Sequence, residues 1–87
     1  DILSYLRLSQ NLNDDMALKR IINVPARGIG KTTVEQLEMK ASENKISLYN
    51  SIMRAIDERM FNAGTVSKLR NFLNLIDDLG AQSKTFK

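Results

Sequence analysis

The sequence contains no cysteine, no histidine and only one proline. Without cysteine, neither a disulfide framework nor a thiolate metal site can form. Without histidine, the chain lacks the commonest general acid/base and the commonest metal ligand. No apolar run approaches the roughly 20 residues that a membrane helix needs, and no secretory signal pattern opens the chain. We therefore expect no catalytic residue, no metal site and no membrane contact.

What remains is the composition of one small folded domain. Of the 87 residues, 43% are hydrophobic and 26% are charged, which is typical of globular proteins. A single core in a chain this short is near the lower limit of what folds unaided. The sequence begins with Asp1 rather than Met, and we expect it to be a fragment of a longer protein.

Apolar spacing predicts an all-α fold of about five short helices with no strand. We expect these helices over about residues 1–10, 14–22 and 31–43, then from 48 to a break at 62–64, and over 65–79. Gly80 is well placed to end the last helix, and we expect residues 81–87 to be frayed. The first helix has an apolar stripe formed by Ile2, Leu3, Leu6 and the pair Tyr5 and Leu8. The apolar cover of the second helix comes from Met16, Leu18, Ile21 and Ile22.

Three helix starts carry capping signals. Asn13 or Asp14 can cap the second helix and Ser47 the fourth. Thr32 and Glu35 have the spacing of a capping box at the start of the third helix.

Positive charge gathers in one stretch of the chain. The net charge is +3, from 13 basic and 10 acidic residues. Between residues 16 and 34 no acid occurs, and the stretch carries four basic residues, Lys19, Arg20, Arg27 and Lys31. Nine basic and ten acidic residues are left elsewhere, so the whole excess lies here. A local basic patch favours a polyanionic partner.

This stretch contains a tight turn, P-A-R-G-I-G-K, between two predicted helices. Gly30-Lys31-Thr32 matches the end of a phosphate-binding Walker A loop, but Pro25 stands where that loop needs its first glycine. Proline lacks the amide N–H that such a cradle uses, and no strand precedes it. Nucleotide hydrolysis by this chain alone is therefore disfavoured, and we expect no enzyme activity and no cofactor in it.

The turn and its flanking helices favour phosphate binding instead. They form a helix-hairpin-helix-like element around residues 14–43, in which glycine allows close backbone approach and the next helix presents its positive end. The candidate DNA-binding residues are Arg27, Gly28, Ile29, Gly30, Lys31, Thr32 and Thr33. None of them reads base edges, so we expect sequence-independent binding. With up to four cations engaged, the salt slope should be no steeper than about −3.6.

The alternative interpretation is that Gly28-Ile29-Gly30 only closes a turn between two helices. The chain would then be a structural or interaction module without direct nucleic-acid contact. An exposed hairpin that shares one face with Arg27 and Lys31 favours the first interpretation, and a hairpin buried against other helices favours the second.

The motifs also resemble a known family. Y-L-R-L at 5–8, N-D-D at 13–15, R-I-I-N-V-P at 20–25 and R-G-I-G at 27–30 are similar, in order and spacing, to the start of accessory subdomain 2B of UvrD/Rep/PcrA-type superfamily-one DNA helicases. The resemblance is strong over residues 1–40 and collinear to about Leu79. It implies a helical, partial 2B fragment spanning 1–87, whose hairpin lies on the phosphate backbone of duplex DNA at a fork.

The resemblance has consequences for the parent protein. It implies an ATP-dependent 3′–5′ DNA helicase of repair or replication, with ATP and Mg²⁺ bound outside these residues. Its partners would be DNA and the remaining subdomains of the parent. It also implies a cytoplasmic, nucleoid-associated bacterial protein.

Overall fold

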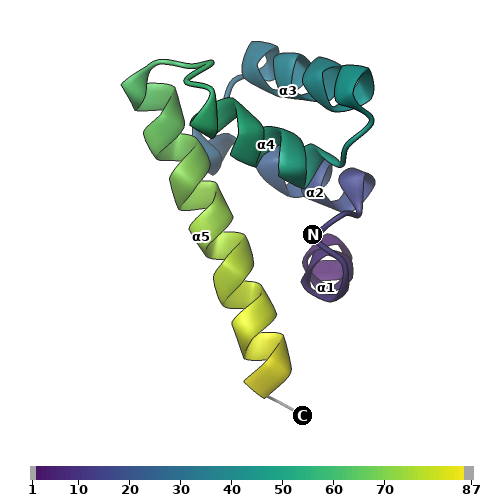
Figure 1. The fold of residues 1–87 in the computed structure, drawn as a ribbon. Helices are drawn as coiled ribbons and strands as arrows, with labels where there is room; N and C mark the ends of the chain where they lie inside the picture. The colour runs from purple at the N-terminus through teal and green to yellow at the C-terminus, as the bar shows by residue number, and fades with distance from the viewer. Residues whose placement is uncertain (1, 86–87) are drawn as a thin grey trace.

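The computed structural model describes residues 2–85, and the side chains of residues 2–78. Within these residues it contains no strand and five α-helices, so the prediction of an all-α fold is confirmed. The elements are α1 (Ile2–Gln10), α2 (Asp15–Ile22), the 3₁₀ turn η1 (Pro25–Arg27), α3 (Lys31–Asn44), α4 (Leu48–Asp57) and α5 (Ala63–Thr85). Figure 1 shows α3 beside α4 and α5 as one long helix along an edge of the molecule. No described helix combines the length and the apolar character needed to cross a membrane.

Side-chain caps begin two of the helices as the sequence predicts. The Asp14 carboxylate accepts the Ala17 N–H at 3.1 Å at the start of α2. The Ser47 hydroxyl accepts the Asn50 N–H at 3.2 Å at the start of α4. Each bond satisfies one of the N–H groups that the first turn of a helix leaves without a partner, which is worth about 1 kcal/mol.

The predicted capping box at Thr32 is wrong. Helix α3 begins at Lys31, and its N-cap is Gly30, without a side-chain hydrogen bond. The Val34 N–H already bonds to the Gly30 carbonyl at 3.2 Å. Thr32 therefore lies inside the first helical turn and cannot act as the cap. Thr32 and Glu35 have the spacing of a capping box, but the helix begins two residues earlier than a cap at Thr32 would require.

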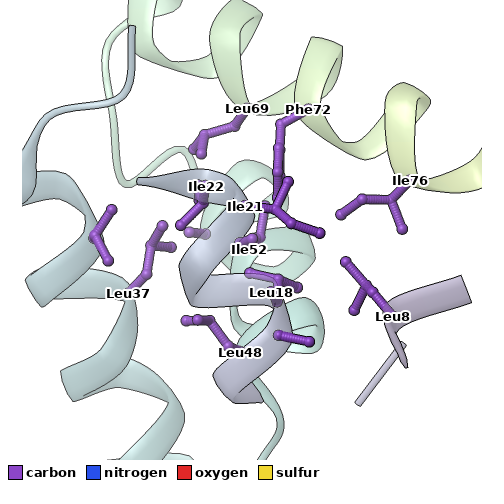
Figure 2. Close-up of a cluster of buried hydrophobic side chains, with 13 residues drawn as sticks. Leu8, Leu18, Ile21, Ile22, Leu37, Leu48, Ile52, Leu69, Phe72 and Ile76 are labelled. Carbon is purple, nitrogen blue, oxygen red and sulfur yellow. The ribbon is translucent and has the colours of Figure 1, made fainter. Parts of the chain in front are cut away.

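One hydrophobic core joins all five helices. Figure 2 shows Leu69 and Phe72 of α5 pointing toward Ile22 and Ile21 of α2, with Leu8 of α1 opposite Ile76. Leu37 from α3 and Ile52 from α4 complete the cluster, and both are fully buried. Burial of each such side chain contributes roughly 1.5–3 kcal/mol. The core fixes α3 and α5 relative to the turn between α2 and α3.

The start of α1 departs from the expected packing. Its buried residues are Ser4 and Leu8, one helical turn apart, and this face contacts α2 and α5. Ile2, Leu3 and Leu6 lie together on another face of the helix and are 77%, 66% and 55% exposed. Leu8 is fully buried and Tyr5 packs against the core, so the predicted apolar stripe is covered only in part. Met16, expected in the apolar cover of α2, is also exposed.

Polar contacts fix α3 against α4. The buried Ser51 hydroxyl donates to the Leu37 carbonyl at 2.7 Å. Lys40 forms an ion pair with Glu58 at 2.6 Å, and this hydrogen bond lowers the pKa of Glu58 below its usual value. Because α3 is held along its length, its first turn has a defined position at the surface.

Helix α5 is longer than predicted. It begins at Ala63 and continues through Gly80 to Thr85, so Gly80 does not end it. A glycine inside a helix costs about 1 kcal/mol relative to alanine but does not break the hydrogen-bond ladder. Of the segment expected to be frayed, residues 81–85 are helical, and residues 86 and 87 lie outside the described residues.

Candidate nucleic-acid interface

The turn between α2 and α3 is built from η1 and two glycines with different backbone conformations. The N–H of Arg27 donates to the Val24 carbonyl at 2.9 Å, and that of Gly28 donates to Pro25 at 3.0 Å. Gly28 then adopts the left-handed conformation, with φ 70° and ψ 16°. Gly30 is extended, with φ −74° and ψ 159°. The sequence predicts unusual angles for this turn, but only Gly28 has them.

Gly30 leaves the start of α3 open. A Cβ at this position would meet no atom within 4 Å apart from its chain neighbours. Any residue could adopt its φ and ψ, so the backbone does not require glycine there. Its effect is to leave the adjacent amides uncovered at the surface.

Free amides follow the turn in an unbroken run. Within the described residues, the N–H groups at 29–33 have no acceptor. The first turn of α3 holds no acidic side chain and no capping oxygen. The partial positive charge at this helix end is therefore uncompensated by the chain, and an anion is the complementary ligand.

The predicted side chains divide into an exposed and a partly buried group. Lys31 and Thr32 are exposed, whereas Thr33 is half-buried. Ile29 is half-buried and packs against the core, as expected. The exposure of the hairpin thus agrees in part with each interpretation. The glycines and Lys31 lie at the surface, as DNA binding requires, whereas Ile29 packs against the core, as a structural turn would.

Arg27 is turned toward the protein. It is half-buried, and its Nη2 donates a hydrogen bond to the Tyr5 hydroxyl of α1. Its Nε is buried without a partner. Because the tyrosine hydroxyl is neutral, the bond orients the guanidinium without cancelling its charge. Arg27 therefore adds positive potential beside the turn and joins it to α1.

The four cations of the basic stretch do not form one continuous patch. A cation from another helix, α5, lies beside the turn. Lys19 forms an ion pair with Glu38 of α3 at 3.1 Å, so part of the local charge is neutralised. Lys68 of α5, which sequence reasoning did not select, lies against Gly28. The only sequence signal for it is its place one turn before the buried Phe72, at the border of the apolar face of α5.

The donor set does not fit a nucleotide–metal site. Within the described residues, no group of three or more acidic side chains could hold a metal ion. Pro25 occupies the first position of η1, where a Walker loop would need a glycine amide. The uncovered groups of the turn are hydrogen-bond donors, suited to phosphate oxygens.

Comparisons with known proteins agree on one family. The model of the UvrD-like helicase C-terminal domain matches residues 1–85. The ATP-dependent DNA helicase Rep of Buchnera aphidicola is 39% identical over 83 residues, and DNA helicase II of Escherichia coli is 35% identical over 83. The ATP-dependent DNA helicase PcrA of Staphylococcus aureus is 42% identical over 79 residues.

These alignments cover nearly all of this chain but little of its relatives. They span 95%, 95% and 91% of the chain, against 13%, 12% and 11% of the three helicases, respectively. The chain thus corresponds to a small part of each relative.

Proposed function

The chain belongs to the family of UvrD-like helicase C-terminal domains, and on this premise we propose that it binds DNA through the turn between α2 and α3. The ligand is the phosphate backbone of a duplex or fork. The contacts come from the predicted set, namely Arg27, Gly28, Ile29, Gly30, Lys31, Thr32 and Thr33. Because these groups address phosphates rather than base edges, binding is independent of sequence.

The run of free amides at 29–33 carries this proposal. A helix start without a cap or an acidic residue has unsatisfied donors, which water or an anion must satisfy. Gly30 keeps side-chain atoms away from them. Lys31 supplies a mobile cation at the same place. A phosphate oxygen can accept from the amides while the ammonium neutralises its charge.

The proposal extends to the parent protein. Its relatives are named as helicases, two of them as ATP-dependent DNA helicases. We infer that the chain forms part of accessory subdomain 2B of an ATP-dependent 3′–5′ DNA helicase. ATP and Mg²⁺ would be held by other segments of that protein. The role of these residues is to hold duplex DNA beside the motor.

The test is fluorescence anisotropy of a labelled duplex titrated with the chain and with a Lys31→Glu variant. Glutamate at the first position of a helix interacts favourably with the macrodipole, by about 0.3–1 kcal/mol. The substitution should therefore preserve or raise helix stability while it weakens DNA binding. Opposite signs of the two effects separate lost contact from lost folding.

Lys45→Glu is the control matched for net charge, and its free energy of unfolding is measured alongside because an acid at the C-terminal end of a helix is unfavourable. Lys45 is exposed at the other end of α3, about 20 Å away at 1.5 Å per residue. The two variants have the same net charge. Equal weakening by both would mean that only overall charge matters, and undiminished binding by Lys31→Glu would refute the proposed site.

A second candidate function is favoured by the uncovered face of α1. Ile2, Leu3 and Leu6 are each more than half exposed, which is unusual for three apolar residues on one short helix. We infer that this face packs against the remaining subdomains of the parent. This role is compatible with DNA binding, since Ile2, Leu3 and Leu6 are not among the residues proposed to contact phosphate.

A further inference from the structure

Lys68, on α5, lies against the turn between α2 and α3. A Cβ placed on Gly28 would be 3.5 Å from both Cδ and Cε of Lys68, and 3.7 Å from its Nζ. These are ordinary van der Waals distances, so the aliphatic stem of the lysine passes over the Gly28 backbone. Glycine at position 28 is required for the left-handed φ, whereas the space beside Lys68 would accept a Cβ.

The position of Lys68 is fixed by the core. The next residue, Leu69, and Phe72 one turn further along are both buried. Ile29, on the other side of the contact, packs against the same cluster. The base of the lysine and the turn are therefore held in one arrangement before any ligand binds. Such preorganisation lowers the entropic cost of binding.

The charge of Lys68 is not used within the chain. It is exposed, and within the described residues neither Lys68 nor Lys31 forms an ion pair. Arg27 adds a third cation beside the turn, bonded only to a neutral hydroxyl. Cations around one turn without a counter-charge raise the local positive potential, which a bound anion neutralises.

We propose that Lys68 is a phosphate-binding residue of the DNA site formed by the turn. Its ammonium would neutralise a backbone phosphate at the turn, so that α5 contributes directly to a site that the sequence assigns to residues 27–33. This inference rests on the proposed function. It adds a contact that lies 40 positions away from Gly28 in sequence.

The experiment compares Lys68→Gln with Arg70→Gln in the anisotropy titration at several salt concentrations. Arg70 is exposed on the same helix and borders a different hollow, with Tyr49, Asp57 and Asp77. Both variants lose one positive charge. If Lys68 engages a phosphate, its removal should make the salt slope shallower by about 0.9, whereas Arg70→Gln should leave the slope unchanged. Between 50 and 200 mM salt, this difference amounts to about 3.5-fold in relative affinity.

The outcomes separate this inference from the proposed function. Binding that depends on Lys31, with equal slopes for Lys68→Gln and Arg70→Gln, would overturn the role of Lys68 and leave the site at the turn intact. Absence of salt-dependent binding by the unsubstituted chain would overturn both. Circular dichroism of each variant checks that its helical content is unchanged, and Lys68→Arg should retain the slope if the cation itself is what binds.

Discussion

At the scale of single residues, Gly28 and Gly30 look equivalent in the sequence but have different roles. Gly28 is left-handed and lies beneath Lys68. Gly30 has ordinary angles and open space around it. The first glycine is required by the fold. The second is required only if something approaches the backbone closely.

Alanine substitutions should separate these two roles. Gly28→Ala should lower the free energy of unfolding by roughly 1–2 kcal/mol, the cost of a left-handed non-glycine residue. Gly30→Ala should leave it nearly unchanged, because the poorer cap is offset by a less flexible unfolded chain. Gly30→Ala should still weaken duplex binding, by about 1 kcal/mol or fivefold, if its methyl group impairs one phosphate contact. Urea unfolding and anisotropy on both variants measure these effects.

The opposite pattern would contradict the assignment. If Gly30→Ala destabilised the chain more than Gly28→Ala, the two glycines would have been assigned the wrong way round. If the Gly30→Ala variant bound DNA as tightly as the unsubstituted chain, no phosphate would approach this backbone.

At the scale of the helices, α4 and α5 share a polar contact. Tyr49 of α4 and Asp77 of α5 line the same hollow, and the two side chains interact. Partial burial raises the pKa of Tyr49 above its ordinary value of 10.0, and the negative charge and hydrogen bond of Asp77 raise it further. The protonated phenol is therefore favoured in the folded state.

This shift predicts an alkaline loss of stability. A group whose pKa is raised on folding contributes fully below its unfolded pKa, here about 10, and loses that contribution as pH rises through the folded pKa. Asp77→Asn should bring the pKa of Tyr49 closer to the ordinary value. Thermal unfolding across pH 9 to about 11.5 should thus show a smaller alkaline loss for the variant. A larger loss in the variant would contradict the contact.

The helices themselves were largely predictable because their signals are local. Asp14 and Ser47 act as caps where the sequence indicates, and Val34, Leu37 and Ala41 form the buried face of α3. The predictions that were wrong concern features that depend on the rest of the fold, such as which side of a helix is buried and where a helix begins. The apolar stripe of α1 gives no information about which neighbour covers it, and Thr32 had the right spacing at a helix that begins earlier.

The candidate site was predictable only in part for the same reason. Gly28, Gly30 and Lys31 lie in one local motif, so the sequence alone identified the turn. The bond from Arg27 to Tyr5 and the contact of Lys68 with Gly28 join residues far apart in the chain. Such pairs follow from the packing of α1 and α5 on a common core, and no periodicity within either helix indicates them.

At the scale of the whole molecule, fewer cations lie beside the turn than the number of basic residues in the basic stretch indicates. Four cations in the basic stretch predict a salt slope no steeper than about −3.6. The structure pairs Lys19 with Glu38, and Arg20 borders a hollow with Arg7 and Asp14 rather than the turn, so neither is counted at the turn. Three cations surround the turn instead, namely Arg27, Lys31 and Lys68.

This count predicts how the molecule binds duplex DNA as a whole. If those three cations each neutralise a phosphate, the logarithm of affinity should fall with the logarithm of salt concentration with a slope no steeper than about −2.7. Two duplexes of unrelated sequence should give the same affinity at each salt concentration, since amides and ammonium groups at the backbone carry no base information. Anisotropy titrations of both duplexes provide the measurement. A slope clearly steeper than about −2.7 would require cations beyond these three, and a clear preference for one duplex would require base contacts that the turn does not offer.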